Sequence, residues 1–348
     1  MSQGSSRWTA ADVPDQSGRT AVVTGASSGL GLVTASVLAG HGAAVILACR
    51  DLAKAEQAAG RIRAGSAGAS VRVVRLDLAS LASVREAASE IRAACPRLDL
   101  LINNAAVMRP PYQRSADGFE LTFATNHLGH FALTGLVLDS MLATPGSRIV
   151  TVSSVAHRDG VMHFDDLQFE QGYRADDAYA QSKLANLLFT HELATRLQAA
   201  SYQTMALAAH PGVARTGLFR WDPRLVRMLL SPALRTVMFR FVQSAQLGAL
   251  PTLRAAADPA ARTGEFYGPG GWREYTGYPV RAEPASLSRD AESRRRLWQV
   301  SEQLTGVSYL SLPCGRAGPT PGWHVTAPQT YNPSRPSRLP PGRTRLAC

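Results

Sequence analysis

The sequence predicts an α/β protein built on a doubly wound parallel sheet of about seven strands, with helices on both faces. The prediction rests first on short apolar runs that alternate with helical segments of ten or more residues between positions 20 and 152. This alternation is typical of βαβ units, whose right-handed crossovers cover both faces of the sheet. The second observation is the composition, 45% hydrophobic and 18% charged, which is ordinary for a globular α/β protein.

The elements follow in chain order. Each expected strand is a short run rich in β-branched or aliphatic residues, and the first of them ends at Gly25. Strands are expected at residues 20–24, 44–48, 71–75, 98–102 and 148–152, and helices at residues 30–40, 52–64, 81–94 and 118–142. No linker divides residues 18–310, so we expect them to form a single domain after a flexible lead at residues 1–17.

The positive charge is concentrated at the C-terminus. Residues 311–348 hold five arginines, no acidic residue and eight of the 21 prolines, and so supply +5 of the net charge of +11. Such a composition buries too little apolar surface to offset its ordering entropy, which predicts a disordered tail. Its aromatic residues are Trp323 and Tyr331, without the interleaving typical of nucleic-acid binding, so we expect no nucleic-acid partner.

Signals for membrane insertion, secretion and metal binding are weak. No apolar run approaches the ~20 residues that span a bilayer, and the N-terminus lacks the apolar core of a signal peptide. The four cysteines have neither CxxC pairing nor metal-ligand spacing, and among the histidines only His127 and His130 form a loose pair. We therefore expect free thiols, no metal site, no transmembrane segment and a cytoplasmic protein.

A glycine-rich turn follows the first expected strand. The segment Thr24-Gly-Ala-Ser-Ser-Gly-Leu-Gly31 joins that strand to the first helix. Glycines at such a turn let the backbone approach a pyrophosphate, and the helix N-terminus offers unpaired N–H groups and a positive dipole. The alternative is a tight turn whose small residues serve packing alone. The dinucleotide reading predicts a Rossmann-type site with contacts from Gly25, Ser27, Ser28, Gly29, Leu30 and Gly31.

The end of the second strand indicates which dinucleotide binds. In NAD-binding folds an acidic residue there accepts hydrogen bonds from the adenosine ribose, whereas here Cys49 takes the expected position and Arg50 follows. A guanidinium suits a 2′-phosphate through charge-assisted bonds, so NADP is favoured over NAD. Asp51 is the competing acid, and its alternative role is to cap the helix that starts at Leu52.

Tyr179 and Lys183 are four residues apart, which places them on one face of a helix. A nearby ammonium lowers a phenol's pKa from about 10 toward working pH, so Tyr179 can act as a general acid/base on a carbonyl oxygen. A surface Tyr–Lys pair is the alternative. The scarcity of lysine makes such a chance pair less frequent, because Lys54 and Lys183 are the only lysines among the 37 Lys and Arg residues.

Between residue 18 and about residue 305 the chain resembles the short-chain dehydrogenase/reductase family, and most closely its retinol-dehydrogenase-like, broad-specificity branch. Besides the glycine-rich turn, the motifs that carry the resemblance are Asp77-Leu78, Asn103-Asn104-Ala105-Ala106, Asn126-His-Leu-Gly-His-Phe131, Ser153-Ser154, Tyr179-x-x-x-Lys183, Ser182-Lys-Leu-Ala-Asn186 and His210-Pro-Gly-Val213. In this order and spacing they are specific. There are two departures: Ala106 replaces the family's usual glycine, and the tail has no recognised counterpart.

The resemblance implies a role for each motif residue. Tyr179 would exchange a proton with the substrate oxygen, and Lys183 would bind the nicotinamide ribose. Ser154, the second serine of its pair, would hydrogen-bond the substrate oxygen. Asn126 would hold a water that links Lys183 to solvent. The remaining implied cofactor contacts are Asp77, Leu78, Asn104, Ala105, Ala106, Pro211, Gly212, Val213 and Thr216.

Together these features predict an NADP(H)-dependent oxidoreductase that transfers a hydride between nicotinamide and a carbonyl or alcohol group of a lipophilic small molecule. Residues 214–243 are apolar with interspersed arginines, which predicts a lid over an apolar substrate or, alternatively, a helix in peripheral contact with a membrane. The resemblance also implies a homo-oligomer. A catalytically silent dinucleotide-binding regulator is the alternative function, although such a protein would have lost Ser154, Tyr179 or Lys183 and this chain retains them.

Overall fold

A computed structural model describes residues 7–213 and 243–310, which belong to one compact unit. Several expectations lie outside the described residues: the lid apart from Gln243, the cofactor contact of Thr216, the first six residues of the lead, and the tail at residues 311–348. The boundaries proposed for the lead, the domain and the tail therefore stay predictions.

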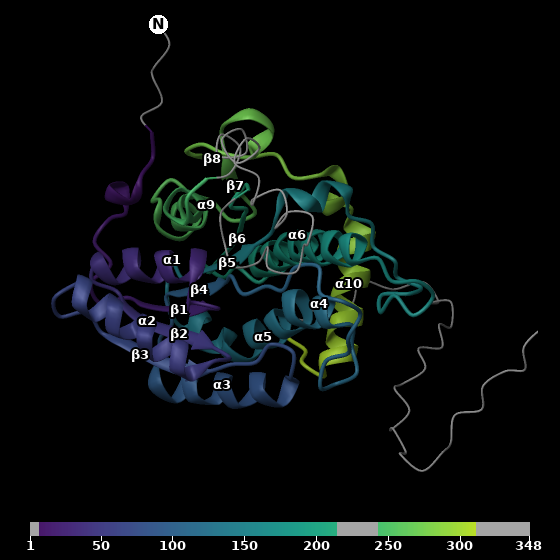
Figure 1. The fold of residues 1–348 in the computed structure, drawn as a ribbon, viewed down its shortest axis with the longest axis horizontal. Coiled ribbons are helices and arrows are strands. Elements are labelled where there is room, and N and C mark those ends of the chain that lie inside the picture. Colours follow the sequence, from purple (N-terminus) through teal and green to yellow (C-terminus); the bar gives the residue numbers. More distant parts are fainter. Residues whose placement is uncertain (1–6, 214–242, 311–348) are drawn as a thin grey trace, which may run out of the picture. The chain divides into compact units, whose positions relative to one another are not determined.

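The described residues contain one sheet of eight strands in the order β3-β2-β1-β4-β5-β6-β7-β8 (Figure 1). The strands are β1 (Thr20–Thr24), β2 (Ala44–Cys49), β3 (Val71–Arg75), β4 (Leu100–Asn103), β5 (Arg148–Val152), β6 (Met205–Ala209), β7 (Phe266–Pro269) and β8 (Pro279–Arg281). Every neighbouring pair from β3 to β7 is parallel, and β8 adds an antiparallel edge to β7. The predicted doubly wound sheet is confirmed, with one strand more than expected.

Helices cover both faces of this sheet (Figure 1). They are α1 (Gly29–Gly40), α2 (Leu52–Gly65), α3 (Leu81–Ala94), α4 (Leu121–Phe123), α5 (Gly129–Leu142), α6 (Ala175–Ala199), α9 (Ala245–Ala257) and α10 (Ala291–Thr305). Alternate residues of each strand serve opposite layers: Ala21 and Val23 pack with α1, α2 and α9, whereas Val22 packs with α3, α5 and α6. A second helical layer, α10, covers α6, so α6 is buried on both sides.

The long helix expected at residues 118–142 is interrupted. It begins at Leu121, where the Glu120 side chain caps the N–H groups of Thr122 and Phe123, and it widens into a π-helical turn at Ala124–Leu128 before α5. The turn contains Asn126, whose side chain is hydrogen-bonded to the backbone of Val107. A π-turn adds one residue to the helical circuit and is frequent at functional sites, and periodicity alone does not reveal it.

The N-terminal lead, expected to be flexible, is attached to the domain where the structure describes it. A short 3₁₀ helix spans Ala10–Asp12, Val13 joins the core, and the Gln16 N–H donates to His41 O at 2.7 Å. Trp8 also packs against the core as a partly buried side chain. The apolar Trp8 and Val13 are the sequence features that account for this packing.

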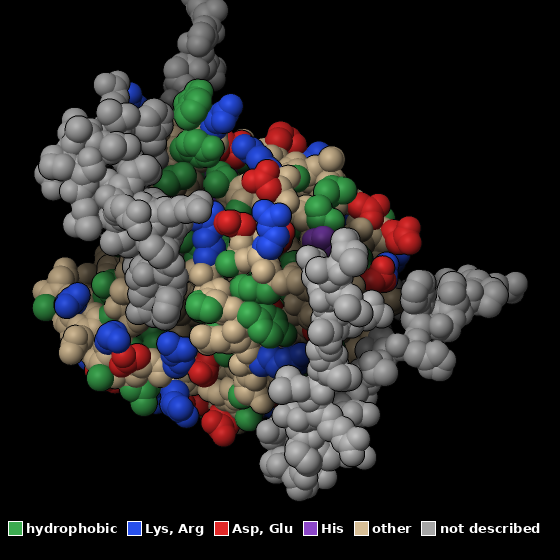
Figure 2. Space-filling model, turned by 45° about the vertical axis from the view of Figure 1, so that its right-hand side comes forward, with side chains coloured by type: hydrophobic (Ala, Val, Ile, Leu, Met, Phe, Trp, Pro, Cys, Tyr) green, Lys and Arg blue, Asp and Glu red, His purple; other side chains and the backbone are tan. Residues whose placement is uncertain are grey.

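No helix within residues 7–213 and 243–310 combines the length and apolar character needed to cross a bilayer. In the same residues no group of three or more His, Cys, Asp or Glu side chains is placed to hold a metal ion. On the face drawn in Figure 2, basic and acidic side chains are interspersed over the described surface rather than gathered in one basic patch.

Candidate active site

The main cavity, of about 730 Å³, lies at the carboxyl ends of the parallel strands, where ligands bind in open α/β sheets. Its lining comes from the carboxyl ends of β1 to β6, or the residues just after them, and from α6, so residues far apart in the sequence meet there. The predicted site residues that line it are Gly25, Ser27, Ser28, Gly29, Leu30, Gly31, Arg50, Asp77, Leu78, Asn104, Ala105, Ala106, Tyr179, Lys183 and Pro211. Asn126, Ser154, Gly212 and Val213 do not line the cavity and are described below through their contacts.

The glycine-rich turn at residues 24–31, called the cradle below, leaves space that side chains larger than glycine would fill. Gly25 and Gly29 have φ angles of +66° and +57°, in the left-handed region that favours glycine. A Cβ on Gly25 would come within 2.9 Å of Ala105 Cβ, and one on Gly31 within 2.6 Å of Asn104 Nδ2. Ser28 begins α1 without a capping hydrogen bond from its own side chain. The turn therefore fits a phosphate group bound by backbone N–H groups.

The charged groups beside this cradle belong to the start of α2. Asp51 is the N-cap of α2: its carboxylate accepts from the Lys54 N–H at 3.1 Å and pairs with Lys54 Nζ at 2.6 Å. These hydrogen bonds from Lys54 lower the pKa of Asp51. The capping role considered for Asp51 is thus confirmed. Arg50 and Lys54 both line the cavity, and Lys54 is a contributor that the sequence analysis did not assign.

Tyr179 and Ser154 meet at the other end of the cavity. Tyr179 is buried on α6, and the Ser154 hydroxyl, at the carboxyl end of β5, lies near enough to its phenol to lower the pKa of Tyr179. Ser153, the other serine of the pair, turns away and donates its hydroxyl to the Lys183 backbone carbonyl at 2.8 Å. Geometry therefore separates the two serines, leaving Ser154 beside Tyr179 and Ser153 as a link between β5 and α6.

Lys183 lies one turn beyond Tyr179 and is 2% exposed. Its Nζ donates to Val152 O at 3.1 Å and lies 5.7 Å from the centre of the Tyr179 ring. Burial lowers the pKa of Lys183 to about 7, because desolvation disfavours the ammonium. The side chain therefore switches between charged and neutral forms near neutral pH.

The pKa of Tyr179 differs from the expectation based on Lys183. Burial raises it above the ordinary value, and the nearby Ser154 hydroxyl and the charge of Arg109 act in the opposite direction. The cation that opposes the burial effect in this structure is thus Arg109, which the sequence analysis did not select. The physical reason is that Lys183, with a pKa of about 7, is already neutral at the higher pH where Tyr179 would ionise.

Arg109 follows β4 in the loop after the Asn103–Ala106 motif and has a φ of +53°. Its guanidinium is paired with Asp176, in the first turn of α6 and three residues before Tyr179. This contact ties the β4 loop to the start of the helix that carries Tyr179 and Lys183. An arginine three residues after the motif and an acid near Tyr179 were visible in the sequence, but nothing in either pattern indicated their pairing.

Asn126 is fully buried and binds backbone as well as a side chain. Its Oδ1 accepts from Val107 N–H at 2.8 Å, and its Nδ2 donates to Val107 O at 3.0 Å and to Ser182 Oγ at 3.0 Å. Val107 lines the cavity. In this structure the Asn126 side chain therefore fixes the β4 loop against α6.

The third side of the site is the turn after β6. Gly212 has a φ of +61°, and a Cβ there would come within 2.3 Å of Tyr275 O. The Val213 N–H donates to the same Tyr275 carbonyl at 2.8 Å, and the Gln243 side chain donates to Pro211 O. Pro211, which lines the cavity, is thereby held against the segment that follows β7.

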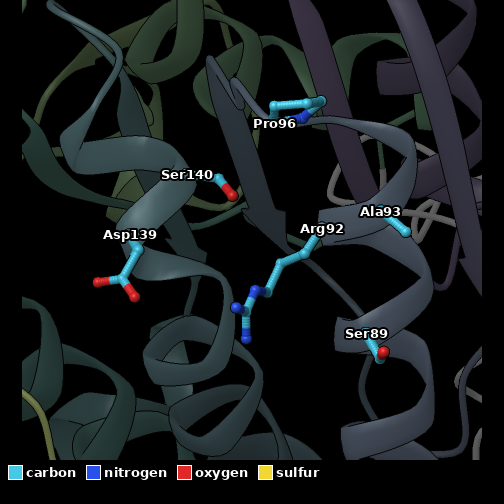
Figure 3. Close-up of a pocket in the computed structure, with 6 residues that line it drawn as sticks. All are labelled: Ser89, Arg92, Ala93, Pro96, Asp139 and Ser140. Atoms are coloured by element: carbon cyan, nitrogen blue, oxygen red, sulfur yellow. The ribbon is translucent and has the colours of Figure 1, made fainter.

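A second depression, of about 530 Å³, lies between α3 and α5 (Figure 3). Its lining residues are Ser89, Arg92, Ala93, Pro96, Asp139 and Ser140. None of the predicted site residues is among them. The predicted site residues line the cavity at the strand ends instead.

Comparison with known proteins identifies the family of this chain. The sequence profile of the short chain dehydrogenase family matches residues 19–222. Retinol dehydrogenase 13 of Homo sapiens is 43% identical over 307 residues, which cover 87% of this chain and 88% of that protein. Retinol dehydrogenase 14 of Homo sapiens is 41% identical over 303 residues, which cover 83% of this chain and 87% of that protein.

Solved structures share the fold of this chain. An uncharacterised protein from Mycobacterium paratuberculosis superposes with a TM-score of 0.71 at 41% identity, covering 86% of this chain and 98% of that chain. A structure described as an NAD(P)-dependent gluconate 5-dehydrogenase from Beutenbergia cavernae, with bound NADP, has a TM-score of 0.56 at 27% identity and covers 72% of this chain and 94% of that chain.

Proposed function

The chain belongs to the short-chain dehydrogenase family and is an NAD(P)-dependent oxidoreductase of CH–OH and C=O groups, and from this premise we propose that it prefers NADP(H), acts on lipophilic carbonyl or alcohol compounds and uses Tyr179 as its general acid/base. The observation that carries the proposal is one cavity lined both by Tyr179 and Lys183, with Ser154 beside Tyr179, and by the glycine cradle. Acid/base and phosphate-binding groups are thus held in one cleft.

Each catalytic side chain has a task that follows from its surroundings. The nicotinamide supplies or accepts the hydride when the cofactor is bound. In the reducing direction the Tyr179 hydroxyl donates its proton to the substrate oxygen, and its raised pKa keeps it protonated at neutral pH. Ser154 donates a hydrogen bond to the same oxygen as negative charge develops there. Lys183, with a pKa of about 7, can return a proton toward Tyr179 or hold the ribose hydroxyls.

The preference for NADP rests on the charges near the cradle. Arg50, Asp51 and Lys54 all line the cavity, and the Asp51 carboxylate is engaged in capping α2 and in its ion pair with Lys54. A 2′-phosphate would find two cations and no unengaged acid at this corner of the cavity. The NADP bound in the Beutenbergia cavernae structure is consistent with this assignment.

The proposed substrate class rests on the named relatives and on the composition of residues 214–243. Relatives named retinol dehydrogenases make retinoid aldehydes and alcohols the first compounds to test. The apolar composition of residues 214–243 supports a lipophilic substrate, either beneath a lid or drawn from a membrane surface. A cytoplasmic location with peripheral membrane contact and a homo-oligomeric state remain parts of this proposal.

The test is a panel of retinoid, aliphatic and aromatic aldehydes, ketones and alcohols, each measured with NADPH or NADP and with the corresponding non-phosphorylated cofactor. We expect turnover of apolar carbonyl compounds, followed at the nicotinamide absorbance, and faster turnover with NADPH than with NADH. Cofactor binding without turnover of any compound would favour the catalytically silent regulator instead.

A further inference from the structure

The segment between β7 and β8 contacts the turns that follow β5 and β6. Its residues 270–278 include a 3₁₀ turn at Trp272–Glu274, in which Arg273 and Glu274 have φ angles of +50° and +57°. Side chains with a Cβ rarely adopt this region, so neighbouring contacts must hold the two residues there. Two of these contacts are made by the Glu274 carboxylate.

Glu274 uses both of its oxygens. Oε2 accepts from His210 Nε2 at 2.8 Å, and Oε1 accepts from Arg158 Nη2 at 2.7 Å. His210 and Arg158 belong to two different turns, one after β6 and one after β5. A single carboxylate therefore joins the two turns that border the reacting end of the cavity.

His210 transmits this contact to the turn that contains Pro211. With Nε2 donating to Glu274, its Nδ1 is the acceptor for the Gly212 N–H at 3.3 Å. Burial lowers the pKa of His210, which favours the neutral ring that this pattern requires. The ring lies against Phe266 and directly over Gly268, where a Cβ would come within 2.0 Å of Nε2. The ring position is therefore tightly defined.

Arg158 transmits the contact to the turn that begins with Ser154. It lies in the 3₁₀ helix Val155–Asp159, of which Ser154 is the N-cap. The neighbouring His157 donates through Nδ1 to Ser154 O at 2.6 Å and accepts through Nε2 from the Ala285 N–H at 3.1 Å. The Ser154 turn is thus supported by residues on both sides of β8.

We propose that Glu274 is a positioning residue that couples the Pro211–Gly212 turn to the Ser154 turn, so that the nicotinamide and the substrate oxygen are held in one relative geometry. The inference rests on the proposed function, since it assigns the two turns to the nicotinamide and to the substrate oxygen. Glu274 contacts neither the cofactor nor the substrate in this scheme and acts through His210 and Arg158. None of these three residues was selected from the sequence as a site residue.

The test compares Glu274→Gln with Glu283→Gln. Gln keeps the shape of the side chain but can accept from only one of the two donors. Glu283 is a matched control, because its carboxylate makes an exposed ion pair with Arg289 at an N–O distance of 2.6 Å. Neither residue lines the cavity. We expect Glu274→Gln to lower kcat about 10- to 100-fold, since small misplacements of reacting groups have effects of this size. The dissociation constant for NADPH should stay nearly unchanged, because the cradle and Arg50 are intact.

The deuterium isotope effect on hydride transfer separates positioning from general stability. With deuterated NADPH, Glu274→Gln should show a larger isotope effect on kcat than the wild type, because hydride transfer becomes more rate-limiting. Glu283→Gln should match the wild type in all of these measurements. Arg158→Gln provides a second variant if Glu274→Gln folds poorly, since the Arg158 side chain is 39% exposed, and it should reduce kcat in the same direction by a smaller factor.

Two results would overturn the inference in distinguishable ways. If Glu274→Gln and Arg158→Gln keep the wild-type kcat and isotope effect, with a change in melting temperature alone, the bridge is only structural. If the wild type reduces no carbonyl compound with either nicotinamide cofactor, the proposed function fails and this inference fails with it.

Discussion

The two ends of the cavity are built on opposite principles. The cradle end consists of the turn between β1 and α1 and the exposed side chains Arg50 and Lys54 at the start of α2. The catalytic end consists of buried side chains, with Tyr179, Lys183 and Asn126 at 8%, 2% and 0% exposure. One end binds through backbone groups and solvated charges, and the other acts through groups removed from water.

This difference in burial shows that function costs stability at the catalytic end and little at the cradle end. Exposed charges near the cradle are hydrated and screened, so they cost the fold little and set affinity and selectivity. Burial at the catalytic end shifts the pKa values of Tyr179 and Lys183 and requires each polar group to be matched by a partner. We therefore expect substitutions at the catalytic end to have the larger effects, and the predictions below test this ordering.

The largest effect is expected for Tyr179→Phe. The change removes the proton donor and one oxygen, and leaves the volume nearly unchanged. Since general acid/base catalysis contributes about 10²–10⁴-fold, kcat should fall by at least this factor while the NADPH dissociation constant stays nearly constant. Steady-state kinetics and a fluorescence binding titration measure the two quantities. A fully active variant would remove the mechanism and leave only a dinucleotide-binding fold.

Lys183→Arg tests whether charge alone suffices at the catalytic end. The guanidinium keeps the positive charge but is broad, planar and ill-suited to a site where Lys183 has 2% exposure and one backbone acceptor, Val152 O. We expect loss of most activity. An active Lys183→Arg enzyme, assayed beside Tyr179→Phe, would show that the lysine is incidental to the reaction.

Acid should lower the free energy of unfolding, because the fold buries neutral histidines. Burial lowers the pKa values of His130 and His157 to about 4, from an ordinary value near 6.5. Between these values the unfolded chain binds protons that the folded state refuses, so stability present above pH 6.5 is lost as pH falls toward 4. A shift of this size corresponds to about 3 kcal/mol for a fully buried histidine.

Chemical denaturation at a series of pH values measures this loss. His157→Gln is the useful companion, because an amide can still donate to Ser154 O and accept from the Ala285 N–H while carrying no charge. The variant should lose less stability than the wild type over the same pH interval. A flat wild-type profile between pH 6.5 and 4 would contradict the prediction.

At the cradle end, Arg50→Ala should change selectivity rather than turnover. Loss of a charged hydrogen-bond partner costs about 1.5–3 kcal/mol, which is roughly ten- to hundredfold in NADPH affinity, with little change for NADH. Arg61→Ala, at an exposed position of α2 outside the cavity, is the matched control. Equal losses for both cofactors would show that Arg50 does not bind the 2′-phosphate, and a wild type that prefers NADH would reassign the ribose to Asp51.

The smallest effect is expected outside both ends. Deletion of residues 311–348 should leave the melting temperature and turnover nearly unchanged, because their composition does not support a core. Thermal unfolding and the carbonyl reductase assay check this directly. A large drop in melting temperature would mean that the tail packs on the domain or on another subunit.

Most of what the sequence predicted correctly depends on short-range order. The alternation of strands and helices, the glycine turn, the capping alternative for Asp51 and the shared helix of Tyr179 and Lys183 all involve residues within a few positions of one another. Helical periodicity, capping and tight turns arise from backbone geometry over that range, so the amino-acid pattern specifies them. The turn between β1 and α1 and the capped start of α2 were accordingly predicted in detail.

Tertiary structure decided the contacts between distant segments. It separated Ser154 from Ser153, broke the helix at Ala124–Leu128, and paired Arg109 with Asp176. It also brought Glu274 to His210 and Arg158, residues 64 and 116 positions earlier in the chain. Such contacts, and the pKa shifts that follow from burial, depend on how the sheet and its helices pack in space. No local pattern encodes which of many polar side chains will be desolvated together, and for that reason the supports of the catalytic end became visible only in the folded chain.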